Sequence, residues 1–209
     1  LGEDWSFEEA FIKLNKNIEI SFYDHTVGFL FWFKHSFKAF YFFLRYGANF
    51  KNIYKYFYYL KFLKNKKIKH LKFKISQRNN ENNKEISLSN ILKFEKNLIL
   101  KIDIEGDEYK VLKHIITHQK KINCLIIEFH QINKNKKKIK NFFSRVKDLK
   151  NCNISPNNSG GIDKFNDPLT VEVILINKIF LKKNDYKKKI NILYELNNPY
   201  KKDIRLKFK

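Results

Sequence analysis

One stretch of the chain, residues 98–129, limits the possible folds more than any other. Residues 98–104 form an almost continuous apolar run, as in a strand covered on both faces, and Gly106 ends it. Residues 107–118 then carry apolar side chains at helical spacing, and residues 122–129 form a second apolar run. This order predicts two parallel strands joined by a helix.

The alternation of strand and helix patterns continues on both sides of this unit. Before it we expect helices at residues 5–15, 28–46, 50–63 and 86–94, strands at 18–23 and 68–76, and a polar loop at 77–85. After it we expect a helix at 133–149, a loop at 151–161 and a strand at 169–176. The sequence therefore predicts an α/β fold with a largely parallel sheet and helices on both faces.

Acidic residues follow three of the predicted strands. Asp24 ends the first strand, Asp103 and Glu105 come after residues 98–102 of the next, and Glu128 and His130 end the third. Ligands of open parallel sheets collect at the carboxyl ends of the strands, so we expect a pocket there. Asp103 and His130, both at strand ends that face this pocket, are the candidates for a general base.

Three acids are interpreted by their position. Asp24 lies one helix and one strand after Gly2, a spacing at which an acid can accept the ribose hydroxyls of a nucleotide cofactor. Asp107 and Glu108 fall in the first turn of a predicted helix, where the helix dipole favours carboxylates. We expect Asp107 and Glu108 to start that helix.

Two sets of residues could hold a metal ion. Asp103, Glu128 and His130 offer carboxylates and an imidazole, which suit a divalent cation, but nothing in their spacing requires one and we expect no metal. His114 and His118 are four residues apart on one helix, yet the Glu that a catalytic zinc helix needs directly after the first His is absent. We expect both histidines to be structural.

The chain is strongly basic, with 43 Lys and Arg against 21 Asp and Glu and a net charge of +22. Such a charge raises the alternative of a basic nucleic-acid-binding module. However, only four of the basic residues are Arg, the residue preferred for bidentate phosphate and base contacts. The basic runs are also scattered along the chain. We therefore interpret most of the charge as solvated surface Lys and expect no nucleic-acid partner.

Residues 27–46 are the one candidate membrane segment. They are rich in Phe, but Lys34, His35 and Lys38 interrupt them, so they lack the ~20 largely uncharged residues of a spanning helix. We expect an amphipathic aromatic helix that packs on the core or covers a pocket. Peripheral contact with a membrane surface is the alternative.

Several segments resemble the motifs of one family, the FkbM-type S-adenosylmethionine-dependent methyltransferases. The most specific is LKIDIEGDEYKVL at residues 100–112, which resembles the family signature LKIDxEGxExxVL. The opening LGEDWSFE resembles the end of the first cofactor motif, and FYDHTV at 22–27 resembles the second. Three further segments follow in the family's order: IEFH at 127–130, NNSGG at 157–161 and LNNP at 196–199.

This resemblance implies a Rossmann-like class I methyltransferase sheet, mostly parallel with an antiparallel last strand, and S-adenosyl-L-methionine as the cofactor. By position it implies the cofactor-binding residues Gly2, Asp4, Asp24, Ser76 and Asp103. Gly2 would approach the methionine portion of the cofactor, and Asp24 would bind its ribose. Asp103 and Glu105 would lie near the sulfonium and the entering substrate, and Asp103, Glu105 and His130 are the catalytic candidates.

The resulting hypothesis is an enzyme that O-methylates a hydroxyl group of a small-molecule or glycan acceptor. Its alternatives are the nucleic-acid-binding module and a non-catalytic methyltransferase-like protein at a membrane surface. We expect residues 1–209 to form one methyltransferase-like domain that lacks its first strand and part of its first cofactor motif, with residues 27–63 as an aromatic helical insert. Cys124, expected in the core, and Cys152 form no CxxC pair and fit a reducing, cytoplasmic setting.

Overall fold

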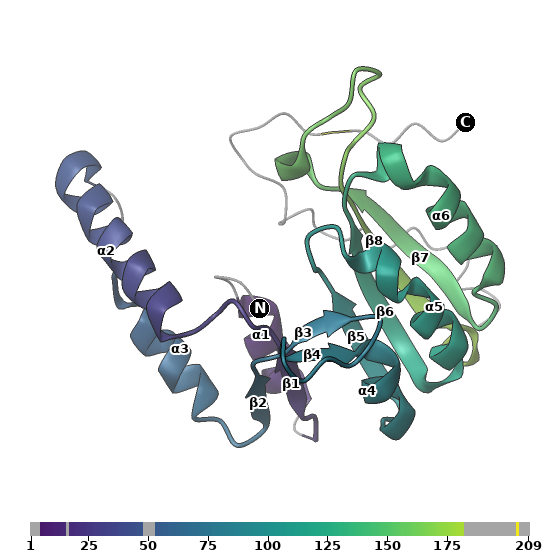
Figure 1. The fold of residues 1–209 in the computed structure, drawn as a ribbon, viewed down its shortest axis with the longest axis horizontal. Helices are drawn as coiled ribbons and strands as arrows, with labels where there is room; N and C mark the ends of the chain where they lie inside the picture. The colour runs from purple at the N-terminus through teal and green to yellow at the C-terminus, as the bar shows by residue number, and fades with distance from the viewer. Residues whose placement is uncertain (1–4, 16, 48–52, 182–203, 205–209) are drawn as a thin grey trace. The chain divides into compact units, whose positions relative to one another are not determined.

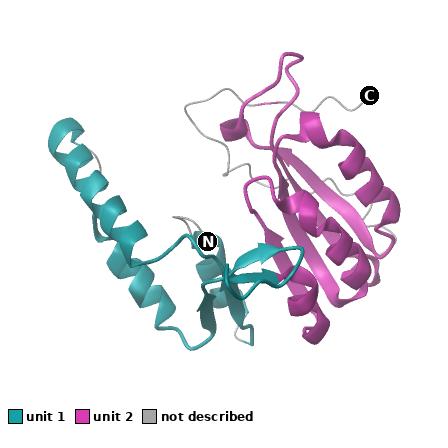
Figure 2. Cartoon of the chain, in the orientation of Figure 1, with its two compact units in different colours: residues 1–86 teal, residues 87–209 magenta. Residues whose placement is uncertain are grey.

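The computed structural model describes residues 5–15, 17–47, 53–181 and 204 (Figure 1). The chain forms two compact units, residues 1–86 and residues 87–209, which are described separately below (Figure 2). That these two units make up a single methyltransferase-like domain stays a prediction.

Unit 1 combines helices with two small sheets. Its elements are α1 (Ser6–Leu14), β1 (Ile20–Tyr23), α2 (Phe29–Tyr46), α3 (Lys55–Leu63), β2 (Ile68–Leu71), β3 (Lys74–Ser76) and β4 (Glu85–Ser87), whose last residue passes into unit 2. β1 pairs with β2 in parallel, from Ile20 opposite Ile68 to Tyr23 opposite Leu71, and β3 pairs with β4. The parallel pair encloses α2 and α3 in its connection, as parallel strands require a long crossover.

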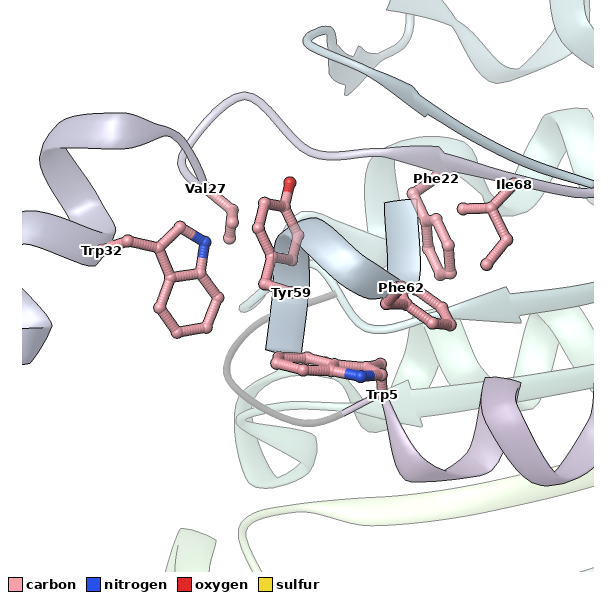
Figure 3. Packing of buried hydrophobic residues seen from close by; sticks show 7 residues of the cluster. All are labelled: Trp5, Phe22, Val27, Trp32, Tyr59, Phe62 and Ile68. Atoms are coloured by element: carbon pink, nitrogen blue, oxygen red, sulfur yellow. The ribbon is translucent and has the colours of Figure 1, made fainter. Parts of the chain in front are cut away.

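The core of unit 1 is aromatic. Figure 3 shows its seven buried residues: Trp5, Phe22, Val27, Trp32, Tyr59, Phe62 and Ile68. The Trp5 ring stands edge-on to Trp32 at 5.8 Å between centroids and stacks on Phe62 at the same distance. Each buried large side chain contributes about 1.5–3 kcal/mol, so this cluster holds α1, α2, α3 and the β1–β2 pair together.

Unit 2 is built on a four-stranded sheet with helices packed against it. Its elements are α4 (Leu88–Phe94), β5 (Leu98–Ile102), α5 (Glu108–His118), β6 (Ile122–Phe129), α6 (Ile132–Arg145), β7 (Leu149–Pro156) and β8 (Val171–Asn177), with 3-10 helices at Gln119–Lys121, Asn158–Gly160 and Lys178–Phe180. The strand order is β5-β6-β8-β7. β5 and β6 are parallel, whereas β8 runs antiparallel to both β6 and β7. The carboxyl ends of β5, β6 and β7 therefore lie at the same edge of the sheet.

The predicted unit of strand, helix and strand at residues 98–129 is confirmed. Along β6, Leu125, Ile127 and Phe129 are fully buried, and α5 contributes Val111 and Ile115 to the same core. α5 contacts both α4 and α6, so these three helices form one layer. The α/β class is thus confirmed, while helices on the second face of the sheet stay a prediction.

The segment predicted as a loop at residues 151–161 is mostly strand. β7 pairs with β8 from Leu149 opposite Asn177 to Pro156 opposite Val171, with a shift of register between Asn151 and Asn153. β7 is the edge strand of the described sheet, and its side chains between Leu149 and Pro156 are exposed or half-buried, so polar residues are tolerated there. An alternation of apolar residues is not needed where the backbone ladder supplies the pairing.

The single strand predicted at residues 68–76 is two strands in different sheets. The amide of Phe73 donates to the carbonyl of Leu71 at 2.8 Å, a tight turn that separates β2 from β3. The helix predicted at 133–149 ends at Arg145 because β7 begins at Leu149. Cys124 is half-buried rather than enclosed in the core.

Candidate active site

Three parallel strands of unit 2 deliver polar residues to one edge of the sheet. Asp103 directly follows β5, Glu128 and His130 lie at the end of β6, and Asn157 directly follows β7. Glu172, the second residue of β8, lies at the same edge, opposite Glu128 in the register. This is the carboxyl edge at which α/β sheets bind ligands.

The turn between β5 and α5 has an unusual backbone. Glu105 has a φ of 53°, the left-handed region that side chains other than Gly rarely adopt, and Gly106 follows with a φ of 99°. The amide of Asp107 then donates to the carbonyl of Ile104 at 3.2 Å and closes the turn. This backbone places Glu105 in solvent beside Asp103.

Glu108 organises this turn from inside. It is the first residue of α5, its side chain is fully buried, and its Oε1 accepts hydrogen bonds from the amides of Gly106 at 3.0 Å and Ile104 at 3.3 Å. Burial alone would raise the pKa of Glu108, but hydrogen bonds from His130 and Gly106 outweigh it and hold the pKa below its usual value. Glu108 is therefore a buried carboxylate that shapes the site rather than a simple helix start.

His130 is held between this buried carboxylate and two exposed ones. Its Nδ1 lies 2.9 Å from Glu108 Oε1, and its Nε2 lies 3.9 Å from both Asp103 Oδ1 and Glu105 Oε2. The hydrogen bond to Glu108 is the main cause that raises the pKa of His130 to about 9, against the opposing effect of burial. At neutral pH the ring is an imidazolium, and its Nε2 proton faces Asp103 and Glu105.

The backbone around His130 is anchored by Tyr109. The Tyr109 hydroxyl donates to the carbonyl oxygen of His130 at 2.6 Å, and its ring lies 5.8 Å from that of Phe129. Burial raises the pKa of Tyr109, so the hydroxyl keeps its proton and remains a donor. Lys138 from α6 lies over the Tyr109 ring at 5.4 Å. These contacts fix where the imidazolium stands.

Glu128 adds a second, more enclosed carboxyl group to the edge. Its Oε1 accepts a hydrogen bond from Nδ2 of Asn157 at 2.7 Å. Burial raises the pKa of Glu128, and the charges of Asp103 and Glu172 add to the rise. Burial likewise raises the pKa of Glu172. The edge thus collects acidic groups whose mutual repulsion a cationic ligand would relieve.

Asp103, Glu105 and His130 could also act as metal ligands. One ligand atom from each lies within 4.8 Å of the others. The predicted set contained Glu128 in place of Glu105. His130 presents a proton on Nε2 at neutral pH, so a cation would have to displace that proton before the imidazole could bind it.

Asp24 has a structural task in unit 1. Its Oδ1 accepts hydrogen bonds from the amide and the hydroxyl of Thr26, at 2.8 and 2.6 Å, and from the amide of Val27 at 3.3 Å. Burial alone would raise the pKa of Asp24, but these hydrogen bonds outweigh it and lower the pKa. His70 Nε2 donates to the Asp24 carbonyl at 2.9 Å, and its Nδ1 lies 2.6 Å from the Tyr59 hydroxyl. The turn after β1 is therefore firmly held.

The structure brings together the three predicted catalytic residues, Asp103, Glu105 and His130. Asp24 and Ser76 both follow or end strands of unit 1, where Ser76 Oγ accepts from the amide of Arg78 at 3.4 Å. Gly2 and Asp4 lie outside the described residues.

Sequence reasoning missed the roles of Glu108, Tyr109, Asn157 and Glu172. Glu108 and Tyr109 lie in the 100–112 segment, but nothing in a linear motif indicates that a side chain turns inward. His118, interpreted as structural, lies with Nε2 2.9 Å from Ser89 Oγ on α4, and burial lowers its pKa.

An α/β unit with carboxylates and an imidazolium at the carboxyl edge of its sheet has the arrangement at which open-sheet α/β proteins bind ligands. The chain belongs to the methyltransferase FkbM domain family, whose model matches residues 44–153. The match includes Asp103, Glu105, Glu108 and His130 and confirms the predicted family. No curated protein and no solved structure matches the chain.

Proposed function

We propose that this methyltransferase uses S-adenosyl-L-methionine to O-methylate a hydroxyl group on a small-molecule or glycan acceptor. The observation that carries the proposal is the grouping of Asp103, Glu105 and His130 at one strand edge, inside the segment that matches the family. The order β5-β6-β8-β7, with β8 antiparallel to its neighbours, supports a Rossmann-like class I sheet with its antiparallel strand near the end.

The residues present fit a cationic cofactor. Glu128 and Glu172 both have raised pKa values, because burial and the charge of Asp103 disfavour their ionised forms. A positive group at this edge would offset that repulsion. When bound, S-adenosyl-L-methionine supplies a methyl group on a sulfonium leaving group. Asp24, with Ser76, Gly2 and Asp4, is assigned to the rest of the cofactor by the family resemblance alone.

The protonation state of His130 suggests different roles for Asp103 and His130. A base that takes a hydroxyl proton needs a free acceptor within hydrogen-bond reach. With a pKa of about 9, His130 carries its proton at neutral pH and is a poor base there. We therefore assign the base role to Asp103, whose side chain is half-exposed, and assign His130 to orient Asp103 and the acceptor through its Nε2 proton.

Calorimetric titration of the full chain with S-adenosylhomocysteine tests the proposal. Asp24→Asn keeps an oxygen for the Thr26 and Val27 bonds but removes the charge, so affinity should fall about tenfold or more while the turn stays folded. Glu19→Gln, an exposed acid paired with Lys69, is the matched control and should bind like the wild type. Equal affinity of wild type and Asp24→Asn would refute the ribose assignment.

Turnover separates the catalytic roles once an acceptor is found. Asp103→Asn should lower kcat by about a hundredfold or more without weakening S-adenosylhomocysteine binding to the same degree. Full activity of both Asp103→Asn and His130→Ala would remove the catalytic assignment.

Two other predictions remain open. The first is the basic nucleic-acid-binding module. Salt-dependent binding to nucleic acid, together with no affinity for S-adenosylhomocysteine, would favour it over the methyltransferase. No helix in the described part of the chain has the length and apolar character to span a membrane. The second is the cytoplasmic setting, which stays a prediction from the cysteine content.

A further inference from the structure

An exposed aromatic stripe runs the length of α2 in unit 1. Its members follow one another at spacings of three or four residues, which places them on one face of a helix. Their side chains are between 46 and 69% exposed, and they are Phe29, Phe33, Phe37, Phe40 and Leu44. An apolar surface of this length is uncommon on a soluble domain and marks a contact site.

The face of α2 that adjoins the stripe packs within unit 1. Trp32 is fully buried in the core of unit 1, and Ser36 Oγ donates to the carbonyl of Ile53, just before α3. At the start of the stripe, the Phe29 ring also meets Tyr56 of α3 edge-on at 6.1 Å. These contacts fix the rotation of α2 against α3, and Figure 1 shows the two helices side by side within unit 1.

A row of cations borders the stripe. Lys34, Lys38 and Arg45 are exposed and follow the stripe along the next face of α2. Arg45 donates to the Tyr41 hydroxyl at 2.8 Å, and Lys38 lies over the Phe42 ring at 5.9 Å, so their stems lie along aromatic surface. No Asp or Glu occurs between Asp24 and Glu81 in the sequence. The hairpin of α2 and α3 therefore has charge of one sign only.

We propose that the α2 stripe docks on an anionic lipid bilayer, with its Phe side chains in the headgroup region and Lys34, Lys38 and Arg45 against the lipid phosphates. Helices that lie in a membrane interface combine a Phe- and Leu-rich face with a basic border, as α2 does. A second copy of the chain would bring two basic rows together, so the charge favours an anionic partner over self-association. This inference does not depend on the proposed methyltransferase activity.

Flotation of the full chain with lipid vesicles tests the proposal. Binding should be strong with phosphatidylcholine vesicles that contain phosphatidylglycerol and at least about tenfold weaker with phosphatidylcholine alone. The triple variant Phe33→Ser, Phe37→Ser and Phe40→Ser should lose about a hundredfold or more in binding. Lys34→Glu with Lys38→Glu should lose about tenfold or more. The matched control, Phe94→Ser with Phe165→Ser, removes two exposed Phe of unit 2 and should bind like the wild type.

Four results would overturn the proposal. They are equal binding to both vesicle types, unchanged binding of the triple variant, a concentration-dependent dimer that the triple variant abolishes, and binding to single-stranded RNA in place of vesicles. Near-ultraviolet circular dichroism checks that each variant keeps the Trp5–Trp32 contact. Should the triple variant unfold, the charge-reversal variant alone decides the outcome, since its substitutions lie in solvent.

Discussion

Glu108 and His130 form the central pair of the candidate site, joined by a bond of 2.9 Å between Glu108 Oε1 and His130 Nδ1. One partner begins α5 and the other directly follows β6, so the pair links the helix to the end of the neighbouring strand. The same Glu108 oxygen holds the amides of the acidic turn. The buried carboxylate of Glu108 thus sets both the orientation of the His130 ring and the shape of the turn before α5.

The first prediction concerns the pH dependence of stability. Folding raises the pKa of His130 from 6.5 to about 9. The pair therefore contributes its full stabilisation below about pH 6.5, and this stabilisation is lost as the pH rises through about 9. Because the pKa of Glu108 is lowered, its carboxylate also stabilises the fold above about pH 4.5, and this stabilisation is lost as the pH falls further. Urea unfolding should show a loss of about 2 kcal/mol between pH 6 and pH 9.5 in the wild type.

Glu108→Gln should be less stable than the wild type at pH 6 and should show little of this pH dependence. Glu95→Gln, an exposed acid in the same unit, is the control and should follow the wild type. Both tryptophans lie in unit 1, so far-ultraviolet circular dichroism must follow the unfolding. A pH profile of Glu108→Gln parallel to that of the wild type would contradict the charged pair.

The second prediction is that Glu128→Gln stabilises the protein. The pKa of Glu128 is raised, by burial first and by Asp103 and Glu172 in addition, so its ionised form costs stability as pH rises above 4.5. Gln keeps the oxygen that accepts from Asn157. At pH 7 the variant should be about 1 kcal/mol more stable, and the difference should vanish near pH 4. Affinity for a cationic cofactor should fall in the same variant.

Glu172→Gln provides the matching test, since Glu172 lies opposite Glu128 and its pKa is also raised. The two substitutions together should gain less than the sum of their single effects, because each removes the same repulsion. Strict additivity, or destabilisation by Glu128→Gln at pH 7, would show that the two carboxyl groups do not oppose each other.

The sequence predicts the part of the fold that depends on apolar periodicity. The buried strand β6 and helix α5 emerge because Leu125, Ile127 and Val111 recur at the periods of strand and helix. β7 could not be predicted in this way. Its pairing with β8 depends on backbone bonds between residues far apart in the chain, and Asn151 and Asn153 give no local signal.

The candidate site also contains residues that could be predicted from the sequence and residues that could not. Asp103, Glu105 and His130 could be predicted because strand ends converge at one edge of a parallel sheet. The role of Glu108 could not, because a carboxylate in a first helical turn usually faces solvent, and only the packed structure shows its burial. The protonation of His130 follows from that same buried contact, so a sequence-based choice of base favoured it equally with Asp103.

The third prediction uses the left-handed backbone of Glu105. At a φ of 53°, a side chain is strained by about 1 kcal/mol, which Gly does not feel. Glu105→Gly should therefore be about 0.5–1 kcal/mol more stable than Glu105→Ala, measured by urea unfolding. Both variants should show the same loss of S-adenosylhomocysteine affinity, because both remove the carboxylate. A less stable Gly variant would mean that the turn relaxes to another conformation.

The last prediction concerns the loop after β7, which positions Asn157 to donate its hydrogen bond to Glu128. A Cβ built on Gly160 would overlap with Oγ1 and Cβ of Thr170, and Thr170 is itself buried. The amide of Asn157 donates to the Thr170 carbonyl at 3.0 Å, so a shift of Thr170 would also move Asn157. Gly160→Ala should destabilise the protein by about 1–3 kcal/mol, as overpacking does.

The double variant Gly160→Ala with Thr170→Ala separates overlap from other causes. Removing the Thr170 hydroxyl and methyl groups relieves the closest contact, so the double variant should be less destabilised than the sum of the single ones. Gly161→Ala is the comparison. Its added Cβ meets no atom, but its φ of 81° strains any side chain, so Thr170→Ala should not rescue it. Full additivity in the Gly160 pair would place the defect in the loop backbone instead of the contact with Thr170.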